Sequence, residues 1–142
     1  MAYDDQNIFA KILRGEAPAH TVYENDDCLA FLDVMPQSDG HTLVLPRAPA
    51  ENLFDLDTAD LASLIRCVQH VARGVREAFG PDGIRLMQFN GPAAGQTVSH
   101  LHFHIVPCYE GEPLGRHGGG MAKTEILEQH AEKLRSALKA LG

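Results

Sequence analysis

Three histidines alternate with apolar residues in one short run of the chain. The run reads SHLHFHIVP, and its histidines are His100, His102 and His104. Successive side chains of a strand point to opposite faces, so we expect the three imidazoles on one face, about 6.5–7 Å apart at Cα. A random chain of this composition would contain such a triplet about twice in a hundred cases. The row could bind a metal ion, surround an anion, or form the solvated face of an edge strand.

The segment before the histidines favours an anion. It reads NGPAAGQTV over residues 90–98, and its glycines allow backbone N–H groups to approach a phosphate closely. Gln96 and Thr97 add side-chain donors, and a neutral imidazole nearby can attack phosphorus. A zinc site would require a further ligand, often a carboxylate. We therefore interpret the run as a site for phosphoryl chemistry, although the loop alone would also suit an ordinary turn.

The spacing of apolar residues predicts the elements that position these groups. Helices are predicted over residues 8–13, 57–79 and 127–141. Strands are predicted over residues 21–24, 28–33, 41–46, 83–90 and 100–106. The strands follow one another through short turns rather than through alternating helices. This order predicts an α+β domain with an antiparallel sheet of about five strands, a long packed helix, a short N-terminal helix and a C-terminal helix.

Length and charge limit the class of protein. We expect 142 residues to form one domain, 1–142, and the net charge of -7 leaves no basic face for DNA or RNA, although a small nucleotide can still bind. The start, MAYDDQNIFAKIL, has neither a basic region nor a long apolar segment, so we expect a cytoplasmic protein without membrane contact. Cys28, Cys67 and Cys108 form no C-x-x-C motif and are odd in number. They are interpreted as core packing residues in a reducing compartment.

The histidine run and its surroundings resemble a known family. GQTVSHLHFHIVP is similar to the signature of the histidine triad (HIT) superfamily. The resemblance to the bacterial type of nucleotide hydrolase in this family extends over residues 8–107, while residues 108–142 form an extension beyond the signature. It implies a HIT-like fold.

The resemblance also implies roles for the histidines. His102 would attack the α-phosphorus of a nucleotide and carry the nucleotidyl group, which water then releases as AMP or a similar monophosphate. The backbone carbonyl of His100 would hold the Nδ1 proton of the nucleophile, so that Nε2 attacks. His104 would donate a proton or hydrogen bond to a phosphate oxygen. His41 matches a further histidine near the triad, with a role less defined than the others.

Further residues match nucleotide-binding positions of the family. Gln96 and Thr97 match contacts to the phosphate and the leaving group, Asn90 matches a polar residue near ribose or phosphate, and Asp33 matches an acceptor for the ribose hydroxyls. Asp33 could instead cap the turn before Pro36. The expected slot for the base comprises Phe9, Ile12, Phe31, Leu32 and Val34. These apolar residues are equally consistent with ordinary core packing.

The substrate implied by the resemblance is a nucleoside phosphoramidate or a dinucleoside polyphosphate, and no residue decides between the two. A homodimer across the long helix and one sheet edge is implied as well. No cofactor is expected, and no structural zinc, because residues 7–10 lack cysteine. The alternatives are a nucleotide-binding sensor or scaffold with little turnover, and a metal-binding protein that uses the same histidines. The other histidines, His20, His70, His117 and His130, are interpreted as surface or helix residues.

Overall fold

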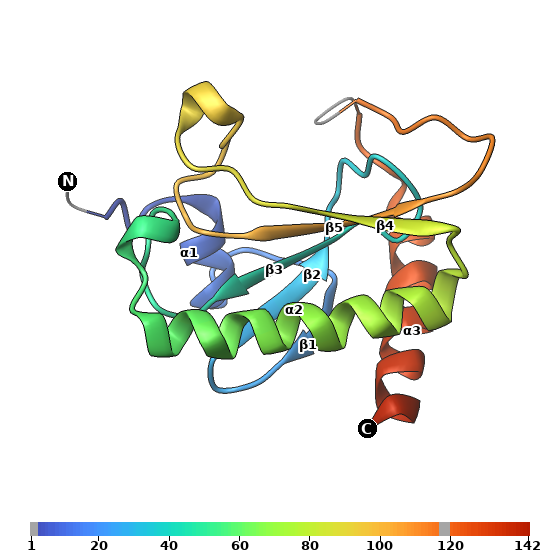
Figure 1. Cartoon of the computed structure of the whole chain (residues 1–142), viewed down its shortest axis with the longest axis horizontal. Helices are drawn as coiled ribbons and strands as arrows, with labels where there is room; N and C mark the ends of the chain where they lie inside the picture. Colours follow the sequence, from blue (N-terminus) through green and yellow to red (C-terminus); the bar gives the residue numbers. More distant parts are fainter. Residues whose placement is uncertain (1–2, 117–119) are drawn as a thin grey trace.

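The computed structural model describes residues 3–116 and 120–142, and within them five strands form one antiparallel sheet (Figure 1). The strands are β1 (Thr21–Glu24), β2 (Cys28–Leu32), β3 (Thr42–Pro46), β4 (Gly83–Met87) and β5 (Phe103–Cys108). Their order in the sheet is β1-β2-β3-β5-β4. The helices are α1 (Ile8–Leu13), α2 (Thr58–Phe79) and α3 (Thr124–Leu141). The predicted α+β fold is therefore confirmed.

Four of the five predicted strands have different bounds in the structure; β2 and β3 are each one residue shorter than predicted, and β4 and β5 differ by more. The fourth ends at Met87 rather than at residue 90, and the fifth begins at Phe103 rather than at residue 100. The backbone N–H of Leu101 donates to the carbonyl of Ala50, 2.8 Å away, instead of joining a strand ladder. His100 and His102 therefore lie just before β5, and only His104 belongs to the sheet.

Helix α2 begins and ends where its capping residues predict. The side chain of Asp57 accepts a hydrogen bond from the N–H of Ala59, and Gly80 ends the helix in the left-handed region with φ of 57°. Gly74 lies where α3 crosses α2, and a Cβ placed on it would approach the Leu138 side chain to 2.4 Å. A larger residue at position 74 would therefore require the Leu138 side chain to shift. Among the described residues, no helix combines the length and apolarity that a membrane crossing requires.

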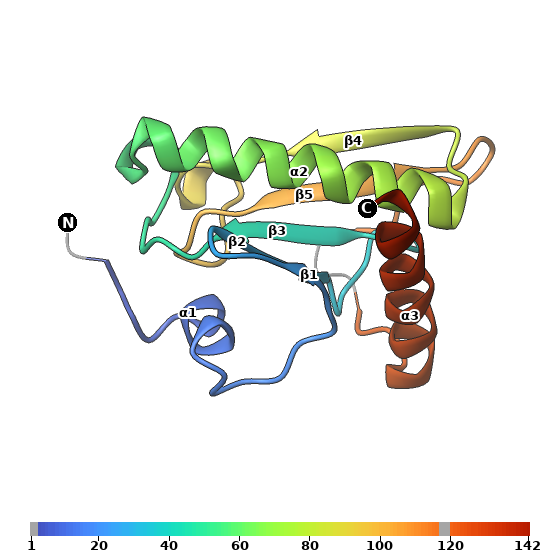
Figure 2. The same ribbon diagram turned by 90° about the horizontal axis from the view of Figure 1, so that it is seen from below.

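Helices α2 and α1 lie on opposite faces of the sheet (Figure 2), and an apolar cluster lies on each face. Along β2, Cys28, Ala30 and Leu32 face the large cluster beneath α2 and α3. Leu29 and Phe31 point the other way and pack with α1 in a smaller cluster. This alternation is the period of two that an extended strand imposes. The face that carries α1 is the one on which the candidate site forms.

The structure corrects the interpretation of the cysteines. Cys28 of β2 and Cys67 of α2 form a disulfide, whereas Cys108 lies outside it. Both disulfide partners are buried, as expected of packing residues, but the expectation that they are reduced is wrong for this structure. They are 39 residues apart in the sequence, and only the packing of α2 on the sheet brings them together.

Candidate functional site

The pairing of β5 with β3 decides which way the last histidine points. His104 lies opposite Leu43, whose side chain belongs to the α1 face, while Ile105 packs beneath α2. His102 precedes the strand but lines the same cavity as His104, and their ring centroids are 5.0 Å apart. The rings of His102 and His104 therefore lie on one side of the chain, as the alternating pattern predicts.

His102 is oriented by the backbone of His100. Its Nδ1 lies 2.6 Å from the carbonyl oxygen of His100. A carbonyl oxygen only accepts, so Nδ1 carries the proton and, in the neutral ring, Nε2 carries the lone pair. This tautomer places the nucleophilic atom of the imidazole at the end of the ring away from the backbone.

The ring of His100 is not part of the cavity wall. It is fully buried, and its Nε2 lies 2.8 Å from the carbonyl oxygen of Pro46. Desolvation by burial lowers the pKa of this imidazole below its ordinary value, so the ring is neutral near pH 7. His100 therefore contributes its backbone carbonyl to the site and anchors that carbonyl through its ring.

His104 contacts a second histidine. Its Nδ1 lies 3.0 Å from Nε2 of His41, and Nδ1 of His41 accepts a hydrogen bond from the backbone N–H of Gln37, also at 3.0 Å. In the neutral His41 ring the proton is therefore on Nε2, which donates to His104. This donation leaves the proton of a neutral His104 on Nε2, so that atom is a hydrogen-bond donor. His41 thus supports His104 from behind and does not line the cavity.

Asp33 belongs to both the cavity and a turn. One carboxylate oxygen accepts a hydrogen bond from the N–H of Met35 at 2.9 Å, which is the turn-capping role considered from the sequence. The other lies 3.5 Å from Nε2 of His41. The carboxylate also lines the cavity, so the two expected roles are compatible.

The histidines open onto a mainly apolar cavity of about 410 Å³. Its volume is in the range of small-molecule sites. The sequence-predicted residues on its wall are Phe9, Ile12, Phe31, Leu32, Asp33, Val34, Thr97, His102 and His104. Residues on the wall that sequence reasoning did not find are Ile8, Pro18, Ala19, Met35, Leu43 and Val98. The apolar spacing of α1 and the inward face of β3 signal only burial, not a role in a cavity.

Phe9 joins the apolar part of the cavity to the histidines. Its ring meets the His102 ring edge to face at 4.9 Å between centroids, and the Phe31 ring at 5.3 Å. Helix α1 holds Phe9 in place because Asn7 caps the helix by accepting from the N–H of Ala10 at 2.9 Å. A planar group that entered the cavity would find aromatic and aliphatic side chains beside the His102 imidazole.

Two predicted nucleotide-binding residues are not on the cavity wall. Gln96 donates to the carbonyls of Glu51 and Val98 and accepts from the N–H of Gly91. Asn90 accepts from the N–H of Leu53 and exchanges hydrogen bonds with Gln88. Both side chains hold the glycine-rich loop in shape. In the structure the polar atoms of both side chains bind protein groups, whereas the sequence predicted a phosphate contact for Gln96 and a position near ribose or phosphate for Asn90.

One group of potential metal ligands lies among the described residues. Oxygen and nitrogen atoms of Asp33, His41 and His104 lie within 4.8 Å of one another. His100 and His102 are not part of this group, so the alternative in which all three histidines of the run share a metal does not fit the geometry. Two of these residues, His41 and His104, also form the hydrogen bond between Nε2 of His41 and Nδ1 of His104.

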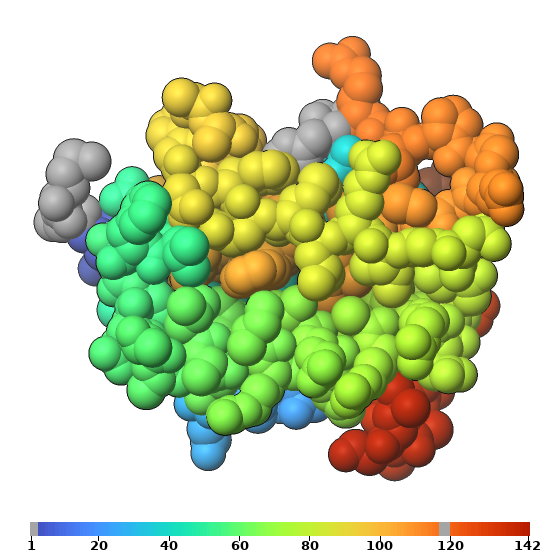
Figure 3. Space-filling model, in the orientation of Figure 1, coloured from blue at the N-terminus to red at the C-terminus, as the bar shows by residue number. Residues whose placement is uncertain are grey.

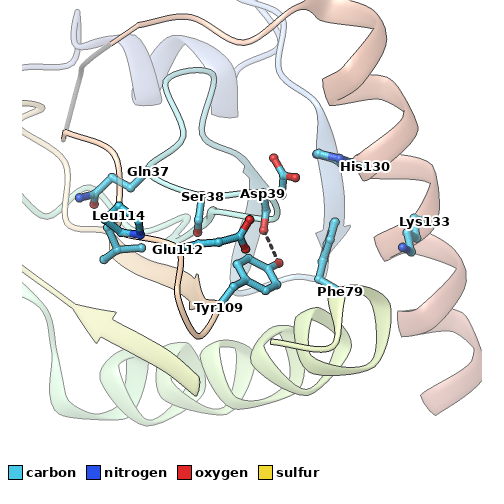
Figure 4. A pocket seen from close by; sticks show the side chains of 10 residues that line it. Gln37, Ser38, Asp39, Phe79, Tyr109, Glu112, Leu114, His130 and Lys133 are labelled. Atoms are coloured by element: carbon cyan, nitrogen blue, oxygen red, sulfur yellow. Dashed lines mark hydrogen bonds between the residues drawn. The ribbon is translucent and has the colours of Figure 1, made fainter. Parts of the chain in front are cut away.

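A second cavity of about 400 Å³ lies between the β2–β3 loop, the segment after β5, and α3 (Figure 4). The hydroxyl of Tyr109 donates to the backbone carbonyl of Asp39 at 2.8 Å on its wall. Glu112 and Lys133 bring opposite charges to the same space. None of the predicted site residues lines it, so the cavity with His102 is the better candidate.

Three of the remaining histidines, His20, His70 and His130, are partly exposed. His20 pairs with Glu128 at 2.5 Å, and the His70 ring lies against Tyr23. His130 packs edge to face on Phe79. His117 lies outside the described residues. These placements agree with their interpretation as surface or helix residues.

Comparison with known proteins identifies relatives across most of the chain. A family model described as "HIT domain" matches residues 14–111. An uncharacterized HIT-like protein of Methanocaldococcus jannaschii is 44% identical over 105 residues, which cover 74% of this chain and 81% of that protein. The adenylylsulfatase HINT3 of Arabidopsis thaliana is 35% identical over 127 residues, 89% of this chain and 61% of that protein.

Solved structures resemble the whole fold. A Hit-like protein of Bartonella henselae, solved with an unknown ligand, has a TM-score of 0.89 and 52% identity over 96% of this chain and 99% of that one. A hypothetical histidine triad nucleotide-binding protein of Sulfolobus tokodaii has a TM-score of 0.87 and 34% identity over 94% of this chain and 92% of that one. A zinc-bound histidine triad family protein of Mycobacterium smegmatis has a TM-score of 0.85 and 34% identity over 96% of this chain and 95% of that one.

Proposed function

The chain belongs to the HIT domain family, whose members bind small nucleotides, and on that premise we propose that it hydrolyses nucleotides at the α-phosphorus. His102 is the nucleophile in this proposal and carries the nucleotidyl group as a covalent intermediate. The supporting observation is the 2.6 Å contact between Nδ1 of His102 and the carbonyl of His100, which assigns the lone pair to Nε2.

Two displacements complete the proposed reaction. In the first, the Nε2 lone pair forms a bond to phosphorus while the bond to the leaving group breaks with its electron pair. The ring of His102 becomes cationic, so its Nδ1–H donates more strongly to the His100 carbonyl. In the second, water bonds to phosphorus and releases a proton to solvent, while the N–P bond breaks and its electron pair returns to Nε2. The His100 contact thus gains strength as the charge develops, which is how a contact accelerates a step.

His104 completes the electrostatics of the proposed site. In its tautomer Nε2 of His104 is a hydrogen-bond donor, and the His104 ring lies beside the ring of His102, which attacks phosphorus. A donor so placed stabilises the negative charge that grows on the phosphoryl oxygens. Thr97 lies on the same wall and adds a hydroxyl.

The rest of the cavity suits a nucleoside. The apolar wall formed by Phe9, Ile12 and Phe31 accommodates a base, and the Asp33 carboxylate accepts hydrogen bonds from ribose hydroxyls. In this arrangement the sugar lies between the base and the α-phosphate. The proposal therefore uses one cavity for recognition and chemistry.

The proposal leaves two kinds of leaving group to be distinguished. One is an amine, which departs protonated, and the other is an anion such as a nucleoside phosphate. The adenylylsulfatase relative adds adenylyl sulfate to the substrates worth testing. The alternatives are a nucleotide sensor or scaffold with little turnover and a metal-binding protein. The donor tautomer of His104 beside the His102 nucleophile favours turnover over mere binding.

We test the proposal by offering adenosine phosphoramidate, diadenosine polyphosphates and adenylyl sulfate in parallel and comparing kcat/KM. His102→Ala should lower the best value by about three orders of magnitude or more, as expected for loss of a nucleophile. Mass spectrometry of a quenched wild-type reaction should show AMP attached to His102. His70→Ala, which changes a surface histidine of α2, is the matched control. Wild-type turnover by the His102 variant would refute the assignment.

The same assay tests the metal alternative. Since we expect neither a metal nor another cofactor, activity should survive extensive dialysis against a chelator, and added zinc should not increase it. Loss of activity that zinc restores would favour the group formed by Asp33, His41 and His104.

We propose that the chain forms a homodimer through α2 and β4. The β1 edge of the sheet is bordered by α3, where Arg135 donates to the carbonyl of Thr21 at 2.8 Å, while β4 is the other edge. Figure 3 shows α2 and β4 side by side on one face of the molecule. Ile65 and Leu86 are exposed there and line an apolar hollow with Ile84. An uncovered edge strand with apolar neighbours favours association with a second copy.

A cytoplasmic location is part of the proposal. The disulfide between Cys28 and Cys67 is more typical of oxidising compartments, so the location requires a direct test. Fractionation of cells that express the tagged chain tests it, with a known cytoplasmic enzyme as the marker.

A further inference from the structure

The N-terminal segment reaches the histidine run from the opposite end of the chain. The hydroxyl of Tyr3 lies 2.5 Å from Nδ1 of His100, although the two residues are 97 positions apart. Their rings meet edge to face at 5.6 Å between centroids. Tyr3 is not in the family signature and does not line the cavity, so neither the resemblance nor the cavity assigns it a role.

The direction of this hydrogen bond follows from the other side of the His100 ring. Nε2 of His100 faces the carbonyl oxygen of Pro46, which can only accept, so the proton of the neutral ring is on Nε2. Nδ1 is then an acceptor, and the Tyr3 hydroxyl must donate to it. Burial raises the pKa of Tyr3 above its ordinary value, which keeps this hydroxyl protonated.

Asn7 completes the arrangement. Its Nδ2 donates to the Tyr3 oxygen at 2.9 Å and to the carbonyl of Asp4 at 2.7 Å, while its Oδ1 caps α1. An amide nitrogen only donates, so the Tyr3 oxygen accepts from Asn7 and directs its own proton to His100. The donors therefore run in one direction, from Asn7 through Tyr3 to His100.

We propose that Tyr3 is a positioning residue for the nucleophile, acting through His100. This inference rests on the proposed function. The ring of His100 is held at one nitrogen by Tyr3 and at the other by Pro46, and these two contacts hold the residue whose carbonyl orients His102. Without the hydroxyl, the buried Nδ1 has lost its donor, and the ring relieves this by rotating or by changing tautomer. Either response displaces the carbonyl that accepts from His102.

The expected effect is on chemistry rather than on substrate binding. The contact between His102 and the His100 carbonyl strengthens only when the ring becomes cationic, so a displaced carbonyl affects the transition state more than the ground state. Tyr3→Phe should lower kcat about tenfold, the value of one hydrogen bond, and leave KM within about twofold. A residue that only stabilised the fold would lower the melting temperature without this selective loss of kcat.

Nitrogen NMR of the imidazoles gives a readout that does not depend on turnover. The wild-type spectrum should show His100 with its proton on Nε2 and an Nδ1 signal typical of a hydrogen-bonded acceptor. In Tyr3→Phe the Nδ1 signal should move to the position of an acceptor without a donor, or the proton should appear on Nδ1. Tyr23→Phe, a change on the outer strand β1, should leave kcat and the His100 signals as in wild type.

A second variant covers the case in which Tyr3→Phe does not fold. Asn7→Asp keeps an oxygen to cap α1 but replaces the donor by an acceptor, which draws the Tyr3 proton away from His100. It should reproduce the loss of kcat and the altered His100 signals with the tyrosine still present. Wild-type kcat in both variants, or reduced kcat with unchanged His100 signals, would overturn the inference while the proposed function stands. A wild-type protein that hydrolyses none of the nucleotides would overturn the proposed function and, with it, this role of Tyr3.

Discussion

His41 and His104 are 63 residues apart in the sequence, yet Nε2 of the first lies 3.0 Å from Nδ1 of the second. The pairing of β3 with β5 brings the two residues together. His41 directly precedes β3, and the first residue of β3, Thr42, pairs with Ile105, the neighbour of His104. The N–H of Gln37 sets the tautomer of His41, which in turn sets that of His104. A backbone group outside the cavity thus decides which nitrogen of His104 can donate inside it.

This relationship predicts the effect of replacing His41. His41→Phe keeps the ring but removes both nitrogens, so the neutral His104 loses the donor that keeps its proton on Nε2. We expect kcat to fall by about tenfold to a hundredfold, as for a weakened transition-state donor, with KM changed by less than about threefold. Steady-state kinetics on the best substrate measures this. His20→Phe, at an exposed ion pair, is the matched control, and equal kcat in both variants would contradict the role of His41.

Gln96 and Thr97 are adjacent, and the structure predicts opposite consequences for them. Gln96→Ala removes hydrogen bonds to Glu51, Val98 and Gly91, so the free energy of unfolding should fall by about 2–3 kcal/mol. Thr97→Val changes an exposed wall residue and should leave stability within about 0.5 kcal/mol while weakening nucleotide binding. Urea unfolding and calorimetric titration with AMP separate the two. A stable Gln96→Ala protein that had lost AMP binding would favour the direct phosphate contact expected from the sequence.

The stability of the protein should depend on pH through His100. Burial lowers the pKa of this ring in the folded protein below the ordinary 6.5, whereas the unfolded chain has the ordinary value. Below about pH 6.5 the unfolded state therefore binds the extra proton, and stability is lost as the pH falls, by up to about 1.4 kcal/mol per pH unit. Above that pH the contribution is constant. An NMR titration of His100 checks the cause, since a midpoint at or above 6.5 would contradict it.

The disulfide gives a prediction that needs no activity assay. Wild-type protein unfolded without reductant should react with one equivalent of a thiol reagent, at Cys108, and with three after reduction. Cys28→Ser together with Cys67→Ser should lower the free energy of unfolding by about 2–5 kcal/mol. Cys108→Ser is the control and should give zero and then two equivalents. Three reactive thiols before reduction would restore the interpretation of reduced packing residues.

The dimer proposal is tested at the uncovered strand edge. Leu86→Glu places a charge in the apolar hollow between β4 and α2 and should convert the dimer to a monomer. Sedimentation velocity measures the change in mass. Leu141→Glu introduces the same charge at an exposed leucine of α3 and should remain dimeric. Identical sedimentation of wild type and both variants would argue against this surface.

Several features of the fold and the site could be predicted from local patterns. The period of 3.6 and the residues Asp57 and Gly80 predict α2 with its ends, because caps and amphipathic spacing act within one helix. The period of two of an extended backbone predicts one face for all three histidines of the run, and the structure places His102 and His104, but not His100, on the cavity wall. The prediction was less accurate for the start of β5, where a hydrogen bond from Leu101 to Ala50 replaces the ladder.

What the sequence determined by itself is therefore the set of chemical groups and their local geometry: a candidate nucleophile, donors beside it, and the extended segments that carry them. The tertiary structure alone decided which groups meet across the chain. Tyr3 contacts His100, Cys28 forms a disulfide with Cys67, and the Gln96 side chain binds the backbone of the glycine-rich loop to which it belongs. The physical reason is that these contacts depend on strand order and helix packing, which close long loops and leave no period in the sequence.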